Sequence, residues 1–224
     1  MATDDMTVVD LEILSDALVG REGGFLAIRR VGLRNVRADG TRSLPYVCDF
    51  LARPMGIDAV VVAIYARSGG TVRVLLRDGL RPPLHLGRAA APVTDDRTRL
   101  FSRELVAGVV ERDDRGEAGL LRRAVLEVEE ESGLIVRPDQ LVVLGAGVFP
   151  SPGAMPERFH LYAVEVDPAA EHERRPMRGD GSPMEEGARL VWMELGAAIR
   201  ACVTGELEDA KTELGLRRLA ELLG

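Results

Sequence analysis

The chain lacks the cysteines that a disulfide framework needs. Its 224 residues include only Cys48 and Cys202, which lie far apart in the sequence and cannot form such a framework. Free thiols suit the reducing cytosol. The amino terminus lacks the basic start and apolar run of a signal peptide, and no apolar run approaches the roughly 20 residues of a membrane helix. We therefore expect a cytoplasmic protein that does not interact with membranes.

A basic excess is also missing, since the formal net charge is -7 and the isoelectric point is near 5.2. This balance argues against a protein that binds nucleic acid by general electrostatics. The three histidines, His85, His160 and His172, show no metal-ligand spacing, so we expect them to be structural or exposed. A chain of this length can bury one good core plus a small extra domain.

Short apolar runs separated by turn residues occupy the first part of the chain. Residues 11–53 alternate such runs with polar turns, which predicts a small antiparallel sheet. The apolar runs at 58–65 and 71–76 flank a Ser-Gly-Gly turn and predict a buried hairpin. Residues 81–99 contain prolines, glycines and scattered charges without a period, so we expect a long loop there.

Strand-length and helix-length patterns alternate in the second part of the chain. Apolar runs predict strands at 141–148, 159–166 and 190–193, and a loop rich in Pro, Glu and Arg follows at 167–184. Apolar residues at helical spacing predict two final helices, over 195–204 and 209–223. Helices and strands together predict an α/β (α+β) fold.

The most informative pattern is an acidic cluster, Glu127, Glu130 and Glu131, at positions i, i+3 and i+4. These positions share one face of a helix, where carboxylates repel one another unless a metal or a basic partner compensates. A solvated acidic face is the ordinary interpretation of such a run. However, an apolar stripe docks the same helix on a core, a C-terminal glycine cap is expected at Gly133, and a glycine-containing loop precedes the helix. This combination predicts a pocket wall.

The run from Glu127 to Leu134 resembles the end of the Nudix hydrolase signature, which reads Gly, five residues, Glu, seven residues, Arg-Glu-apolar-x-Glu-Glu-x-Gly-apolar. With Gly108 and Glu117 as the first Gly and Glu, the first loop is three residues longer than the family's and the next segment one longer. The family's arginine, which braces the metal-binding glutamates, falls on Leu126. Arg122 or Arg123 could reach the same carboxylates from a turn away.

Further motifs in a shared order make the chain similar to one branch, the ADP-ribose pyrophosphatases and related nucleoside diphosphate sugar hydrolases. They lie at 76–83, 104–108, 149–158 and 205–212. The resemblance implies a Nudix α/β/α sandwich with a mixed sheet, residues 56–224, behind a small amino-terminal antiparallel β domain, residues 1–55, that mediates dimerisation. A homodimer is the expected assembly, because residues 11–53 are too few to bury a core alone.

The same resemblance implies a set of site residues. Carboxylates suit hard cations, so Mg²⁺ or Mn²⁺ is expected on Glu127, Glu130, Glu131 and the Ala107 carbonyl, with Glu130 also counted as catalytic. Substrate contacts are expected from Arg77, Arg81, Glu104, Ser151, Gly153 and Glu157. The base that activates water is expected on the loop ahead of residues 190–193, at Glu185 or Glu186.

The implied activity is metal-dependent hydrolysis of the pyrophosphate bond of a nucleoside diphosphate sugar, ADP-ribose first, to a nucleoside monophosphate and a sugar phosphate. Two alternatives stay open. One is a catalytically silent Nudix domain that binds a nucleotide sugar as a regulator. The other is a nonenzymatic calcium-binding or scaffold domain, which the acidic helix alone would permit.

Overall fold

The chain folds into two compact units, Met1–Ile57 with Ser151–Glu157 and Asp58–Pro150 with Arg158–Gly224. This computed structural model describes residues 8–20, 25–53, 56–88, 91–93, 97, 99–167, 174–177 and 182–224. His172 and parts of the loops expected at 81–99 and 167–184 lie outside the described residues. None of the described helices is long and apolar enough to cross a membrane.

The first unit is a three-stranded antiparallel sheet in the order β1 (Val8–Val19), β2 (Ala27–Arg37) and β3 (Tyr46–Ala52). This confirms the small antiparallel sheet predicted for residues 11–53. The segment 151–157 joins it through a hydrogen bond in which the Leu51 N–H donates to the Ala154 carbonyl at 2.8 Å. A segment distant in sequence thus belongs to the amino-terminal unit.

The second unit is built on a seven-stranded mixed sheet with the path β10-β5-β4-β9-β8, in which β6 also pairs with β5 and β7 with β4. Only β4 and β9 run parallel. The predicted hairpin is confirmed, because β4 and β5 pair across the Ser68–Thr71 turn. The strands are β4 (Ala59–Ser68), β5 (Thr71–Leu80), β6 (Phe101–Glu104), β7 (Val106–Val109), β8 (Val142–Val143), β9 (Phe159–Glu165) and β10 (Arg189–Glu194).

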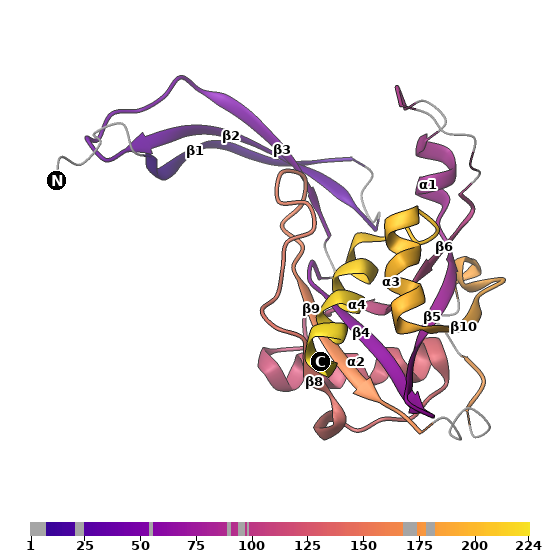
Figure 1. The fold of residues 1–224 in the computed structure, drawn as a ribbon. Coiled ribbons are helices and arrows are strands. Elements are labelled where there is room, and N and C mark those ends of the chain that lie inside the picture. Colours follow the sequence, from indigo (N-terminus) through magenta and orange to yellow (C-terminus); the bar gives the residue numbers. More distant parts are fainter. Residues whose placement is uncertain are drawn as a thin grey trace. The chain divides into compact units, whose positions relative to one another are not determined.

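Helices cover both faces of this sheet (Figure 1). Side chains alternate across a strand, so the even-numbered residues of β4 from Val60 to Ile64 pack with α2 (Gly116–Ser132). The odd-numbered ones from Val61 to Tyr65 pack with α3 (Leu195–Thr204) and α4 (Ala210–Leu223). Burial on both faces explains the continuous apolar run of β4. The predicted α/β/α sandwich with a mixed sheet is confirmed.

Several local predictions were wrong. Part of the loop expected at 81–99 is a short helix, α1 (Pro82–Gly87), which prolines at its first two positions initiate. The strand expected over 141–148 is limited to the two residues of β8. Gly108 and Ala107, expected in a glycine loop, lie in strand β7. Strands of two to four residues are too short to show an alternating pattern.

Candidate active site

Helix α2 presents its acidic residues from a well-fixed position. Ala124 and Val128 are fully buried against the sheet, which fixes the rotation of the helix about its axis. Gly133 ends the helix with φ 71°, and its N–H donates to the Glu129 carbonyl at 2.8 Å. Only glycine adopts this conformation readily, so the predicted cap is confirmed.

Two of the predicted metal ligands lie directly on the backbone of β7. Glu131 Oε2 accepts a hydrogen bond from the Ala107 N–H at 3.1 Å. A Cβ atom at Gly108 would overlap the Glu127 carboxyl group, so this close approach of the carboxyl group to the strand depends on the glycine. The structure therefore brings Ala107, Glu127 and Glu131 together, through a strand rather than the expected loop.

Charge is poorly compensated on this face of the helix. Burial raises the pKa of Glu127 to about 8, and the nearby carboxylates of Glu131, Glu130 and Glu111 raise it further against the opposing charge of Arg123. Burial also raises the pKa of Glu131, although Arg77 and the Ala107 N–H oppose this shift. Like charges held together in this way favour binding of a cation.

Arg123 approaches the acidic cluster from one turn away. Its Nη1 lies 3.8 Å from Glu127 Oε1, and its Nε donates to Asp114 Oδ2 at 2.7 Å. The expectation that Arg122 or Arg123 reaches these carboxylates is confirmed for Arg123. Arg122 instead donates to Asp114 Oδ1 at 2.8 Å.

Asp114 is a residue that the sequence reasoning missed. It is buried, whereas Glu117, which the resemblance assigns as the first signature glutamate, is exposed in the first turn of α2. Although burial opposes the shift, hydrogen bonds led by Arg123 hold the pKa of Asp114 below its usual range. Five residues separate Gly108 from Asp114, which is the signature's first spacing, but eleven rather than seven separate Asp114 from Leu126.

Arg77 links the acidic helix to the segment that carries the predicted base. This arginine is buried on β5, and its Nη1 lies 3.3 Å from Glu131 Oε1 while its Nη2 pairs with Glu185. Glu185 ends the short 3₁₀ helix Pro183–Glu185. Glu186 is exposed at the next position. The structure thus brings Glu185, but not Glu186, to the predicted metal ligands.

A second ion-pair network lies at the end of β6. Arg81 donates to Glu104 through two parallel hydrogen bonds, Nε to Oε1 at 2.9 Å and Nη2 to Oε2 at 2.8 Å. Lys211 contacts the same carboxylate. Burial alone would raise the pKa of Glu104, but the charges of Lys211 and Arg81 lower it to about 2. Glu104 is therefore fully compensated by protein groups.

The remaining predicted substrate residues belong to the other compact unit. Ser151 and Gly153 are exposed in a turn. Glu157 is buried, and its Oε1 lies 3.0 Å from Arg53 Nη2. The Arg53 guanidinium lies over the Phe25 ring, 5.1 Å from its centroid. These residues form their own cluster of charged and aromatic groups.

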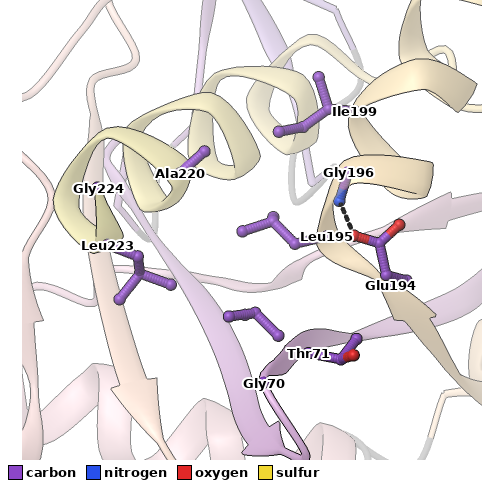
Figure 2. Close-up of a pocket in the computed structure, with 10 residues that line it drawn as sticks. Gly70, Thr71, Glu194, Leu195, Gly196, Ile199, Ala220, Leu223 and Gly224 are labelled. Atoms are coloured by element: carbon purple, nitrogen blue, oxygen red, sulfur yellow. Dashed lines mark hydrogen bonds between the residues drawn. The ribbon is translucent and has the colours of Figure 1, made fainter.

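A shallow pocket elsewhere contains none of the predicted site residues (Figure 2). It is formed by the start of β5, the start of α3 and the end of α4. The Glu194 carboxylate already accepts hydrogen bonds from the Gly196 and Ala197 N–H groups at 2.8 Å each. Because this acid caps the helix, the pocket has no free helix terminus for an anion.

The acidic face of α2 fits a divalent cation by the kind of donor that it offers. Within the described ranges, no three His, Cys, Asp or Glu side chains are placed so that they could hold a metal ion, and Arg77 and Arg123 lie against Glu131 and Glu127. Carboxylate oxygens beside a backbone carbonyl are the ligands that Mg²⁺ and Mn²⁺ prefer. Glu127, Glu130, Glu131 and Ala107 are the residues that would hold the ion.

These features define an α/β/α protein with an acidic helix packed on a strand. The sequence is 30% identical over 160 residues to an ADP-ribose pyrophosphatase of Haemophilus influenzae, and the match covers 71% of this chain and 64% of that protein. The chain therefore spans a little under two thirds of this relative's length. The similarity confirms the resemblance to the ADP-ribose pyrophosphatase branch of the Nudix hydrolases. No protein-family model matches the sequence.

Two solved structures show a weaker likeness. One is a binary complex of the Ap4A hydrolase of Caenorhabditis elegans, with a TM-score of 0.46 and 18% identity, covering 75% of this chain and 97% of that chain. The other is the NUDIX domain of Shewanella oneidensis NrtR complexed with ADP ribose, with a TM-score of 0.46 and 10% identity, covering 75% and 89%.

Proposed function

We propose that the protein is a divalent-metal-dependent hydrolase of the pyrophosphate bond in a nucleoside diphosphate sugar, with ADP-ribose as the preferred substrate. The observation that carries this proposal is the contact of Glu127 and Glu131 with the β7 backbone at Gly108 and Ala107. Burial and the charges of Glu131 and Glu130 raise the pKa of Glu127 to about 8. The similarity to an ADP-ribose pyrophosphatase supports the choice of substrate.

The acidic helix has a clear role in this reaction. Glu127, Glu130 and Glu131 would hold Mg²⁺ or Mn²⁺ with the Ala107 carbonyl, and an ion held there would neutralise pyrophosphate oxygens and acidify the attacking water. Glu185 lies next to the same cluster through Arg77 and accepts the proton of the attacking water. Water adds to phosphorus, and the bridging P–O bond breaks.

Arg77 and Arg81 are the proposed contacts to the pyrophosphate. The Arg77 Nε is buried and has no hydrogen-bond partner among the residues that the structure describes, so this donor is available to a phosphate oxygen. The Arg81 side chain is 38% exposed, and the Nη1 edge of its guanidinium, which does not bond Glu104, is the part that would meet a phosphate. Glu104 orients Arg81. Ser151, Gly153 and Glu157 are further proposed substrate contacts.

The test is a substrate panel with Mg²⁺ and a coupled phosphatase, which detects phosphate-monoester products. The panel contains ADP-ribose, GDP-mannose, other nucleotide sugars and dinucleotides, and the Glu131→Gln protein controls for contaminating activity. Hydrolysis of ADP-ribose in ¹⁸O-water should place the label on a phosphate product. Label on the sugar carbon, or binding of ADP-ribose without any product, would contradict the proposal. The second result would identify a regulatory binding domain instead.

We also propose that a second copy of the chain covers the amino-terminal sheet. Its strands expose large apolar side chains, with Ile13 61% and Leu18 68% exposed, and patches of this kind mark protein interfaces. Light scattering at micromolar concentration should give a dimer mass. The double variant Ile13→Lys with Leu18→Lys should give a monomer, whereas Val203→Lys, at an exposed apolar position of α3, should stay dimeric. A monomeric wild-type protein would contradict this assembly.

A further inference from the structure

The chain contains a single lysine, Lys211, and its ammonium group is almost buried. The sequence has 29 Lys and Arg residues, so the other 28 (29 − 1) are arginines. Lys211 lies in the first turn of α4 with its side chain 12% exposed. Its Nζ contacts Glu104 and lies 2.9 Å from Asp209 Oδ2. A chain that otherwise uses arginine has a lysine where a charge meets two carboxylates in a confined space.

The shape of the two cations explains this choice. The planar guanidinium of Arg81 already binds both oxygens of Glu104. A second planar fork would have to displace the first one to reach the same carboxylate. The ammonium of Lys211 is a compact charge with three donors, so it adds to Oε2 of Glu104 and reaches Asp209 at the same time.

The first turn of α4 is also hydrogen-bonded to the segment between β6 and β7. Asp209 Oδ2 accepts a hydrogen bond from the Thr212 N–H at 2.9 Å, and Thr212 Oγ1 accepts one from the Leu105 N–H at 2.8 Å. Leu105 joins Glu104 to β7, which carries Ala107 and Gly108. Lys211 and Thr212 therefore hold the β6–β7 segment from one helix turn.

We propose that Lys211 is a positioning residue for substrate binding. Its ammonium fixes Glu104, and Glu104 fixes the direction of the Arg81 guanidinium toward the pyrophosphate. Arg81 and Lys211 together balance the charges of Glu104 and Asp209, so Lys211 acts on a bound anion through the orientation of Arg81. This role rests on the proposed hydrolase function, and it assigns Lys211 an effect on substrate affinity rather than on the chemical step.

The kinetic test uses Lys211→Met, which keeps most of the apolar stem and removes the charge. KM for ADP-ribose should rise about tenfold, as expected for loss of a charge-assisted contact, while kcat changes less than about threefold. Lys211→Arg should raise KM as well, because a second fork cannot share Glu104 with Arg81. Arg217→Met, at an exposed position of the same helix that pairs with Glu213, should leave both constants unchanged.

A purely structural role gives a different result. It would lower the melting temperature and the folded fraction, so apparent kcat would fall while KM stayed unchanged. That outcome, or an unchanged KM at full kcat, would overturn the proposal.

A second measurement does not depend on hydrolysis. Protein labelled with ε-¹⁵N lysine should give one ammonium signal from Lys211 at neutral pH, protected from fast exchange, and Glu104→Gln should shift it. Inorganic pyrophosphate should shift it in the wild-type protein. A signal lost to fast exchange, or one insensitive to pyrophosphate, would overturn the inference. If the signal responds but no substrate in the panel is hydrolysed, the proposed function fails and the anion-positioning role of Lys211 stands.

Discussion

Two buried glutamates in this protein have opposite acidity. The side chains of Glu104 and Glu127 are 8% and 12% exposed, so the loss of hydration is similar for both. The pKa of Glu104 is nevertheless lowered to about 2, and that of Glu127 is raised to about 8. Burial raises the pKa at both positions, so the difference must come from their neighbours.

The neighbours differ in number and in sign. Glu104 is hydrogen-bonded by Arg81 and contacted by Lys211, whereas Glu127 faces other carboxylates and an arginine 3.8 Å away. The first glutamate has all of its compensation from the protein and acts as an anchor. The second lacks part of its compensation, which is the arrangement expected where an external cation completes a site.

The largest expected effect comes from removing carboxylates of the acidic cluster on α2, whose negative charge the protein compensates only in part. Glu130→Gln and Glu131→Gln should each lower turnover at least about a hundredfold with the fold intact, because each removes a proposed metal ligand. Glu129→Gln is the matched control, since Glu129 on the same helix pairs with Arg175 at 2.6 Å. Steady-state kinetics with Mg²⁺ measures the three variants. Near wild-type turnover in either ligand variant would mean that the metal is held elsewhere.

The next effect concerns the group that accepts the proton. Glu185→Gln should lower kcat about a hundredfold with substrate affinity largely kept, as expected for loss of a general base. Glu186→Gln should have little effect, because Glu186 is exposed while Glu185 pairs with Arg77. Equal and small effects of both variants, and of the double variant, would place the base outside this segment.

Glu104 and Glu127 should also affect the free energy of unfolding, each in a different pH range. The folded-state pKa of Glu127 lies above its ordinary value of 4.5, so the folded protein binds more protons between pH 4.5 and 8. Without metal, its unfolding free energy should fall as pH rises through that window. The folded-state pKa of Glu104 lies below 4.5, so Glu104 contributes stability above pH 4.5 that is lost as pH falls toward 2.

Urea unfolding in EDTA separates the two contributions. Glu127→Gln should stabilise the metal-free protein at pH 8 by about 2 kcal/mol and flatten its profile between pH 5 and 8. Glu104→Gln should destabilise it at pH 7 by a similar amount and leave that slope unchanged. If the unfolding free energies of both variants and of the wild type changed with pH in parallel, neighbouring charges would not determine the pKa values of Glu104 and Glu127.

The sequence was sufficient to predict the structure where a single residue pattern determines the local geometry. The run around β4 alternates between two buried faces, the cap at Gly133 requires a left-handed backbone, and the spacing of Glu127 and Glu131 places both on one helix face. Each of these follows from local geometry, so no partner segment had to be known.

The sequence was insufficient where partners come from distant segments. Nothing near Lys211 indicates that it meets Glu104, which lies 107 residues earlier. The strand β7 has four residues and depends on pairing with β4. Asp114 was missed because it is an aspartate and because eleven residues, rather than the signature's seven, separate it from Leu126. Tertiary pairing, rather than propensity, decides such positions.

The smallest expected effect tests Arg123, a cation that faces Glu127. Arg123 lies in the interior of α2, four residues before Glu127, and it also donates to Asp114. Arg123→Gln removes the charge that opposes the raised pKa of Glu127, so more of this carboxyl stays protonated at neutral pH. Binding of Mn²⁺ and kcat/KM at pH 7 should each weaken about tenfold, which corresponds to about 1.4 kcal/mol.

Arg122 supplies the matched control for this prediction. It binds the same Asp114 through Nη2 at 2.8 Å, and its side chain is exposed. Arg122→Gln should therefore leave Mn²⁺ affinity and kcat/KM within about twofold, as expected for an exposed ion pair. The deficit of Arg123→Gln should shrink as pH rises above 8, because the Glu127 carboxyl then ionises without help. A deficit that stays constant between pH 7 and 9 would contradict this prediction. It would show that Arg123 acts by packing alone and that its charge does not set the ionisation of Glu127.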